Sequence, residues 1–190
     1  MPGQFDCVIP AAGESKRMGS WKLLLPFRGR TVVEWSVRHA LDACARVIVI
    51  TGFRGAELEA LFHSWENVEL VENPVWERGM FSSIKAGVSR VASERFFVAL
   101  ADMPLIRSEL YRELSEHKGC DAVRPTYEGQ KGHPVLLARS LVQKILSLDD
   151  SRSMADVLRG AQLIELPVDD RFVVCDLDTP SDYETLARLP

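Results

Sequence analysis

Residues 8–22 read Val-Ile-Pro-Ala-Ala-Gly-Glu-Ser-Lys-Arg-Met-Gly-Ser-Trp-Lys. Val8–Pro10 ends a short apolar run, and the small residues after it predict a strand that breaks into a turn. In the loop that follows, glycines and serines surround the cations Lys16, Arg17 and Lys22. Small residues let backbone N–H groups approach an anion closely, and cations neutralise phosphate charge. The segment is therefore a candidate phosphate-binding loop at the end of a strand.

The spacing within this loop fits neither standard phosphate motif. A P-loop requires GxxxxGK[ST], whereas Gly13 and Gly19 are six residues apart and Lys22 does not follow a glycine. A dinucleotide-binding GxGxxG is also absent from the sequence. Spacing alone leaves two interpretations open, a phosphate loop and a solvated connector.

Beyond the loop, apolar strand-like runs alternate with amphipathic helical patterns. Strands are expected at Val47–Thr51, Val68–Val71, Arg95–Ala101 and Ala122–Pro125, and helices at Thr31–Cys44, Ala56–His63, Ser82–Val91 and Ser108–His117. Thr31, with Glu34 three residues later, is typical of a capping box, and Ser108 is a second expected N-cap. This alternation predicts a parallel sheet covered by helices on both faces.

The pattern changes after Thr126, where the turn-rich segment Glu128–Gly132 precedes an expected strand at Val135–Ala138. We therefore expect a small antiparallel excursion in the sheet. The remaining elements are two short helices, a late strand and a final helix, expected at Leu141–Leu148, Met154–Arg159, near Phe172–Asp176 and from Asp178-Thr179-Pro180 onward. The predicted fold class is α/β: a three-layer α/β/α, Rossmann-like architecture with a mostly parallel sheet, in one domain over residues 1–190.

The composition excludes several classes of protein. The 190 residues are 46% hydrophobic and 26% charged, as in soluble globular domains, and the net charge of −4 argues against a nucleic-acid binder. The four cysteines lack metal-binding spacing, and no signal peptide is visible. The longest apolar runs fall far short of the about 18 residues that a membrane span needs. We expect a cytoplasmic monomer without nucleic-acid or membrane partners.

The mild net charge conceals two segments of opposite sign. Gly13–Arg30 holds five cations against the single acid Glu14, a local charge of +4. Ala161–Pro190 holds seven acids against Arg171 and Arg188, a local charge of −5. The first segment suits a triphosphate, and the second is able to supply a carboxylate to a metal ion.

Two aspartates are candidate metal ligands. In open α/β sheets, ligands bind beyond the carboxyl ends of the strands, and Asp102 directly follows a buried strand. A carboxylate there is a common Mg²⁺ ligand, although it is also a common turn residue. Asp178 is a candidate for the same role, and as part of Asp-Thr-Pro it is equally typical of a helix cap.

Several motifs, in order along the chain, resemble the MobA-like NTP transferase family and, within it, the molybdenum cofactor cytidylyltransferase branch. Pro10–Lys22 resembles the xAAGxSxRMGxxK signature of these nucleotidyltransferases, and Leu23–Pro26 resembles a KLLLP continuation. The other matches are Asn73–Ile84 to NPxWxxGMxSSI, Asp102–Pro104 to DMP, Gly132–Val135 to GHPV and Asp178–Pro180 to DTP. Pro10 stands where the family usually has Leu, and Asp149–Ser153, with Asp150 and Arg152, resembles its GDxGxR stretch only loosely.

The resemblance implies a nucleotidyltransferase fold and an enzyme that transfers a nucleoside monophosphate from an NTP to the phosphate of molybdopterin, releasing pyrophosphate. Alanine at position 12 accompanies the CTP enzymes of the family and glycine the GTP enzymes, so Ala12 favours CTP. The alternatives are a GTP-using guanylyltransferase, another small-molecule phosphate nucleotidyltransferase, and a non-catalytic protein that delivers the cofactor to a molybdenum hydroxylase client. Arg17, Lys22 and Asp102 are all present, which favours an enzyme.

The resemblance also implies roles for residues in the nucleotide half, about residues 1–105. Arg17 and Lys22 would be catalytic, binding the triphosphate and neutralising the charge on leaving pyrophosphate. The backbone of Ala11, Ala12 and Gly13 would contact base and ribose, and Asp102 and Asp178 would hold Mg²⁺. A general base is not required, because a phosphomonoester with a second pKa of about 6 is already mostly ionised at neutral pH.

The acceptor half would comprise residues 106–190 together with the loop and helix at 73–87. The implied acceptor-binding residues are Asn73, Gly79, Met80, Ser82, Ser83 and His133. A helix cap with Met80 in the core is the alternative for the serine-containing motif, and a structural turn is the alternative for His133. Trp76 either stacks on a pterin ring or packs locally.

Overall fold

A mixed sheet forms the middle layer of the molecule. The computed structural model describes residues 5–188, except for the side chain of Arg17. The strand order is β10-β7-β9-β6-β1-β4-β5, with β8 paired to β7 outside this path. The strands are β1 Asp6–Pro10, β4 Arg46–Thr51, β5 Val68–Glu72, β6 Arg95–Val98, β7 Ala122–Tyr127, β8 Gln130–Lys131, β9 Val135–Ala138 and β10 Leu163–Pro167. A separate antiparallel pair joins β2 Pro26–Phe27 to β3 Arg30–Thr31.

Most neighbouring strands are parallel, which confirms the predicted α/β class. β1 lies between β4 and β6 and is parallel to both. β9 is antiparallel to β6 and β7, and β8 is antiparallel to β7. This is the antiparallel excursion expected after Thr126. The carboxyl ends of β1 and β6 therefore open at the same edge of the sheet.

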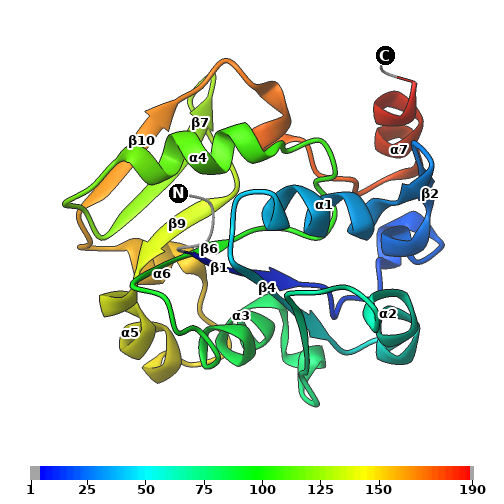
Figure 1. The fold of residues 1–190 in the computed structure, drawn as a ribbon, viewed down its shortest axis with the longest axis horizontal. Helices are drawn as coiled ribbons and strands as arrows, with labels where there is room; N and C mark the ends of the chain where they lie inside the picture. Colours follow the sequence, from blue (N-terminus) through cyan, green and yellow to red (C-terminus); the bar gives the residue numbers. More distant parts are fainter. Residues whose placement is uncertain (1–4, 189–190) are drawn as a thin grey trace.

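Helices cover both faces of the sheet, as Figure 1 shows with α1 and α4 on one side and α3 and α5 on the other. The helices are α1 Val32–Leu41, α2 Gly55–Phe62, α3 Met80–Val88, α4 Ser108–Glu116, α5 Val142–Ser147, α6 Met154–Leu158 and α7 Pro180–Ala187. Alternate residues of β1 pack into two hydrophobic cores. Cys7 and Ile9 pack with α1, α2 and α4, and Val8 packs with α3, α5 and α6. The described helices include none long and apolar enough to cross a bilayer.

Helix capping partly follows the predictions. Thr31 and Glu34 form the expected capping box at the start of α1. Ser108 is the first helical residue of α4 rather than its N-cap. The N-cap position, which has extended backbone dihedrals, is Arg107. At α7 the cap is Thr179, whose side chain accepts from the Asp182 N–H, so the capping alternative for Asp178 is wrong.

The expected late strand near Phe172–Asp176 is also wrong. Arg171–Val174 forms a 3-10 helix, because the Asp170 side chain accepts a hydrogen bond from the Phe172 N–H and closes a tight turn. The edge strand of this region is β10, which pairs in parallel with β7 and was not expected.

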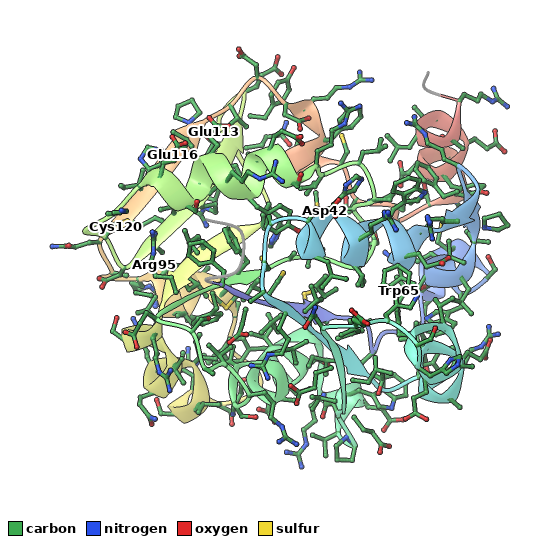
Figure 2. The ribbon with its side chains drawn as sticks, viewed as in Figure 1. Asp42, Trp65, Arg95, Glu113, Glu116 and Cys120 are labelled. Carbon is green, nitrogen blue, oxygen red and sulfur yellow. The ribbon has the colours of Figure 1, made fainter. Side chains whose placement is uncertain are left out.

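The four cysteines are free thiols; Figure 2 shows Cys120 on the opposite side of the molecule from α7.

Helix α3 packs unusually close to the sheet at Gly87. A Cβ added there would lie 2.4 Å from Val8 Cγ1 and 2.9 Å from Ile50 Cδ1. The absence of a side chain at this one position therefore sets how closely α3 approaches β1 and β4. That approach fixes the position of the first turn of α3 relative to the carboxyl edge of the sheet.

We predict that Gly87→Ala destabilises the protein by about 1 kcal/mol or more, because overpacking a buried contact outweighs the better helix propensity of alanine. Urea denaturation would measure the free energy of unfolding. Gly13→Ala is the matched control, since its added Cβ would meet no heavy atom within 4 Å. We expect that control to change the free energy by less than about 0.5 kcal/mol. Equal values for the two variants would contradict the packing argument.

Candidate functional site

A cavity of about 510 Å³ opens at the carboxyl ends of β1 and β6. Four regions that are distant in sequence line it: the loop after β1, the segment around the start of α3, the segment after β6, and the acidic C-terminal segment. Its lining residues are Pro10, Ala11, Ala12, Gly13, Glu14, Ser15, Lys16, Lys22, Leu23, Trp76, Glu77, Gly79, Met80, Ser83, Leu100, Ala101, Asp102, Asp176 and Asp178. Most of the residues predicted for the site therefore meet in one place.

The start of the loop after β1 is held tightly although it is no longer a strand. The Ala11 N–H donates to the Ile50 carbonyl at 2.9 Å, and the Ala12 carbonyl accepts from the Phe53 N–H at 3.1 Å. Trp21 donates from Nε1 to the Gly13 carbonyl at 3.0 Å. Three fixed hydrogen bonds leave this backbone little freedom. Ala11 and Ala12 are buried, whereas Gly13 is exposed at the cavity.

Aromatic side chains brace the loop from behind. Phe53 packs edge-on against both Trp21 and Trp76, with ring centroids 6.0 and 5.9 Å apart. The Arg54 guanidinium lies 4.9 Å from the centre of the Trp21 ring. Trp76 also lies so close to Gly52 that an added Cβ there would be 2.6 Å from its ring. Trp76 therefore packs locally against Phe53 and Gly52, as one of the two interpretations predicted, and it also lines the cavity.

Lys22 lies between two carboxylates at the floor of the cavity. Its Nζ is 2.5 Å from Asp102 Oδ2 and 2.8 Å from Asp178 Oδ1. The three side chains are only 13%, 16% and 21% exposed, so solvent screens these ion pairs weakly. Burial alone would lower the pKa of Lys22, but the carboxylates of Asp102 and Asp178 outweigh burial and raise its pKa. Lys22 is therefore a charged ammonium at neutral pH.

Asp176 is a third acidic side chain of the site, and the sequence interpretation missed it. Asp102, Asp176 and Asp178 each offer an oxygen, and these atoms lie within 4.8 Å of one another. Leu177 between the two aspartates is fully buried, and its N–H donates to the Asp102 carbonyl at 3.1 Å. The alternation Asp176-Leu177-Asp178 was the available signal, because extended backbone directs alternate residues to the same side.

The crowding of these carboxylates affects the protonation of Asp176. Burial raises the pKa of Asp176, and the negative charges of Asp178 and Asp102 raise it further. The charge of Asp176 is thus disfavoured in the folded protein. A bound cation would relieve that penalty, and hard oxygen donors of this kind are the ligands that Mg²⁺ prefers.

Three of the predicted acceptor residues form a buried hydrogen-bond network at the cavity wall. Asn73 donates from Nδ2 to Ser82 Oγ at 2.9 Å and to Ser83 Oγ at 3.0 Å, and its Oδ1 accepts from the Val75 N–H at 3.1 Å. Asn73, Ser82 and Ser83 are all buried, and only Ser83 of the three lines the cavity. Asn73 and Ser82 thus hold the turn into α3 in place.

Between Asn73 and Ser82, four residues line the cavity: Trp76, Glu77, Gly79 and Met80. Gly79 precedes α3 with φ of +107°, a conformation that strongly favours glycine. Met80 is 60% exposed and lines the cavity, so the alternative that places Met80 in the core is wrong. Behind α3, Asp150 accepts from Lys85 at 2.9 Å and from Arg78 at 3.2 Å, which ties the loop at Asp149–Ser153 to this segment.

His133 lies outside the cavity lining. Its main-chain N–H donates to the Val173 carbonyl at 2.9 Å, and its Nδ1 is buried without a hydrogen-bond partner among the described residues. Burial lowers the pKa of His133. This main-chain contact fits the interpretation of His133 as part of a structural turn, and its predicted contact with the acceptor stays a prediction. The side chain of Arg17 lies outside the described part of the structure, so its predicted phosphate contact stays a prediction.

A lysine and several carboxylates around a cavity at this edge of an α/β sheet are typical of enzymes that bind phosphorylated substrates. Residues 7–171 match the family model of the MobA-like NTP transferase domain, and the chain belongs to this family of nucleotidyltransferases.

Individual relatives agree with this assignment, and one carries a different activity. The molybdenum cofactor cytidylyltransferase of Escherichia coli K12 is 32% identical over 180 residues, covering 95% of this chain and 94% of that protein. The nicotine blue oxidoreductase of Paenarthrobacter nicotinovorans is 31% identical over 151 residues, 74% of each chain. The crystal structure of Rv0371c from Mycobacterium tuberculosis H37Rv superposes with a TM-score of 0.85 at 25% identity, covering 98% of this chain and all of that one.

We predict that Asp176→Asn makes the metal-free protein more stable at neutral pH. A raised carboxyl pKa means that ionisation of Asp176 opposes folding, and this penalty applies above its folded pKa and disappears as the pH falls. Thermal denaturation in the presence of a chelator would show a higher midpoint for the variant at pH 7.5. The difference should vanish at acidic pH.

Asp182→Asn is the matched control with the opposite sign. Hydrogen bonds from the Thr179 side chain lower the pKa of Asp182, so its ionisation favours folding at neutral pH. That contribution is lost as the pH falls through the lowered pKa. We expect Asp182→Asn to lower the midpoint at pH 7.5. A shift in the same direction for both variants would contradict the electrostatic interpretation of Asp176.

Proposed function

We propose that this protein transfers CMP from CTP to the phosphate of molybdopterin and releases pyrophosphate. The observation that carries the proposal is the position of Lys22, between Asp102 and Asp178 and in the same cavity as Ala11–Gly13 and Gly79–Met80. A phosphoryl-transfer site needs alignment of the reactants and neutralisation of charge rather than a nucleophilic side chain. The cavity offers groups of both kinds.

The cations of the loop would serve the triphosphate. Lys22, with Arg17, binds phosphate oxygens and neutralises the charge that develops on the leaving pyrophosphate. The attacking oxygen belongs to a phosphate monoester, which is already ionised near neutral pH. The protein therefore does not need to remove a proton from it.

The carboxylates fit a divalent cation. Asp102 and Asp178 supply hard oxygen donors, and Asp176 adds a third within 4.8 Å, which matches the ligand chemistry of Mg²⁺. When bound, Mg²⁺ would bridge phosphate oxygens and neutralise part of their charge.

Different residues of the cavity wall would select the base and the acceptor. Ala12 is buried, and its Cβ would lie 2.8 Å from a Cβ added at Gly52, so the wall near the base is tightly packed. The alanine favours CTP over GTP, in line with the name of the Escherichia coli relative. Ser83, Gly79 and the exposed thioether of Met80 would contact the pterin or its phosphate. The molybdenum hydroxylase that receives the product would be a transient partner.

A screen of four nucleoside triphosphates tests this proposal. We expect pyrophosphate release with Mg²⁺, CTP and molybdopterin, and at least tenfold less with GTP, ATP or UTP. The CMP adduct of molybdopterin would be confirmed by mass spectrometry. Preferential use of GTP would overturn the base assignment, and turnover only with sugar or polyol phosphates would overturn the acceptor. Binding of molybdopterin without turnover of any nucleotide would indicate a delivery protein.

We predict that Lys22→Ala lowers kcat for pyrophosphate release by about 10²–10³-fold, the usual cost of losing a group that stabilises transition-state charge. Lys118→Ala, which removes an exposed lysine outside the cavity, is the matched control and should leave kcat unchanged. Near-normal turnover by a folded Lys22→Ala enzyme would rule out a catalytic role for Lys22.

A further inference from the structure

The Lys22 ammonium lies at the place that a metal ion would need. It bridges Asp102 and Asp178, the latter 156 residues away in sequence, through contacts of 2.5 and 2.8 Å. A divalent cation at about 2.1 Å from the same two oxygens would lie close to this Nζ. Two cations at such a separation repel each other strongly in a partly buried site. The lysine and a metal ion therefore exclude each other from these oxygens.

The charges of the cluster also show that the lysine alone does not satisfy it. Asp102, Asp176 and Asp178 together carry three negative charges, and Lys22 supplies one positive charge. A divalent cation would bring two more positive charges to the same three carboxylates. Asp176 lies beside Asp102 and Asp178, with an oxygen of each residue within 4.8 Å of the others.

Lys22 has an alternative place to go, because it lines the same cavity as the loop Ala11–Lys16. A lysine is a compact charge on a flexible four-carbon stem, so its Nζ can move several ångströms without backbone change. A triphosphate in the cavity would offer it more negative charge than two carboxylates do. Movement of Nζ onto the phosphates would then free Asp102 and Asp178.

We propose that Lys22 is a placeholder cation, which neutralises Asp102 and Asp178 until a nucleoside triphosphate draws it away and a divalent cation takes its position. Nucleotide and metal then bind with positive coupling, and Lys22 carries that coupling. The inference rests on the proposed function, because the triphosphate is the proposed substrate. It adds that the protein without nucleotide binds metal weakly, and that the lysine is the reason.

The first test uses Mn²⁺ alone, without nucleotide. Free Mn²⁺ is measured by electron paramagnetic resonance during titration of the wild type and of Lys22→Met, which keeps the length of the side chain and removes its charge. We expect the variant to bind Mn²⁺ at least about fivefold more tightly, within the usual range of coupling between two sites. Adding Asp102→Asn to this variant should abolish the gain, which would locate the ion at the carboxylates.

Lys85→Met is the matched control, because Lys85 is also a partly buried lysine paired with an aspartate, Asp150, outside the cavity lining. It should leave the Mn²⁺ affinity unchanged. Circular dichroism would establish that each variant is folded, and Lys22→Gln replaces Lys22→Met if the latter is not. A folded, uncharged variant at position 22 that binds Mn²⁺ no more tightly than the wild type would overturn the proposal.

The second test measures the coupling itself with a CTP analogue that carries an α,β-methylene group. Water-proton relaxation separates Mn²⁺ bound in the protein complex from Mn²⁺ held by the analogue alone. We expect the analogue to tighten Mn²⁺ binding by the wild type more than by Lys22→Met. Equal tightening in both proteins would overturn the proposal.

Failure of this inference is distinguishable from failure of the proposed function. If Lys22→Met gains no Mn²⁺ affinity while the wild type still forms the CMP adduct, the placeholder role is wrong and the activity stands. If the variant gains affinity but no nucleotide is turned over, the exchange of cations stands and the activity is wrong.

Discussion

The ion pairs from Lys22 to Asp102 and Asp178 depend on three segments that meet only in the folded protein. The first segment carries Lys22, and the neighbouring Trp21 holds it by a hydrogen bond to the Gly13 carbonyl. The second segment carries Asp102 and follows β6 at the carboxyl edge of the sheet. The Leu177 N–H joins the third segment to the Asp102 carbonyl. Much of the remaining architecture near the cavity serves to hold these segments in register, since a partly buried ion pair requires accurate geometry to offset its desolvation.

The sheet order explains why the C-terminal segment returns to this edge. β9 runs antiparallel to β6, so Gly132 and His133 at its start lie near the carboxyl end of β6. The His133 N–H donates to the Val173 carbonyl, and a Cβ at Gly132 would lie 2.7 Å from that same oxygen. Glycine therefore allows the close approach that guides the chain toward Asp176. The Gly132-His133 motif thus supports the segment that carries the carboxylates, and its predicted contact with the acceptor stays a prediction.

Much of the fold and part of the site follow from the sequence, and the exceptions have physical reasons. Strand and helix periodicity predicted the α/β architecture, because strands such as β1 and β4 are buried on both faces. The apolar run at Phe172 suggested a strand, but the turn closed by Asp170 prevailed. The alternation Asp176-Leu177-Asp178 indicated that the two aspartates share a side, but the proximity of Asp176 to Asp102 arises only in the folded protein.

The charge segregation seen in the sequence acquires a different meaning in three dimensions. Three described cations of the cationic segment already have acidic partners, because Lys16 pairs with Glu14, Arg30 with Glu34, and Lys22 with the acidic C-terminal segment. A nucleotide that bound to these three cations would therefore have to compete with existing ion pairs. Breaking a partly buried pair is costly when one partner is left alone. Under the proposed exchange, a triphosphate that arrives with its own divalent cation would avoid that cost, because its phosphates would bind the lysine while its metal would bind the carboxylates.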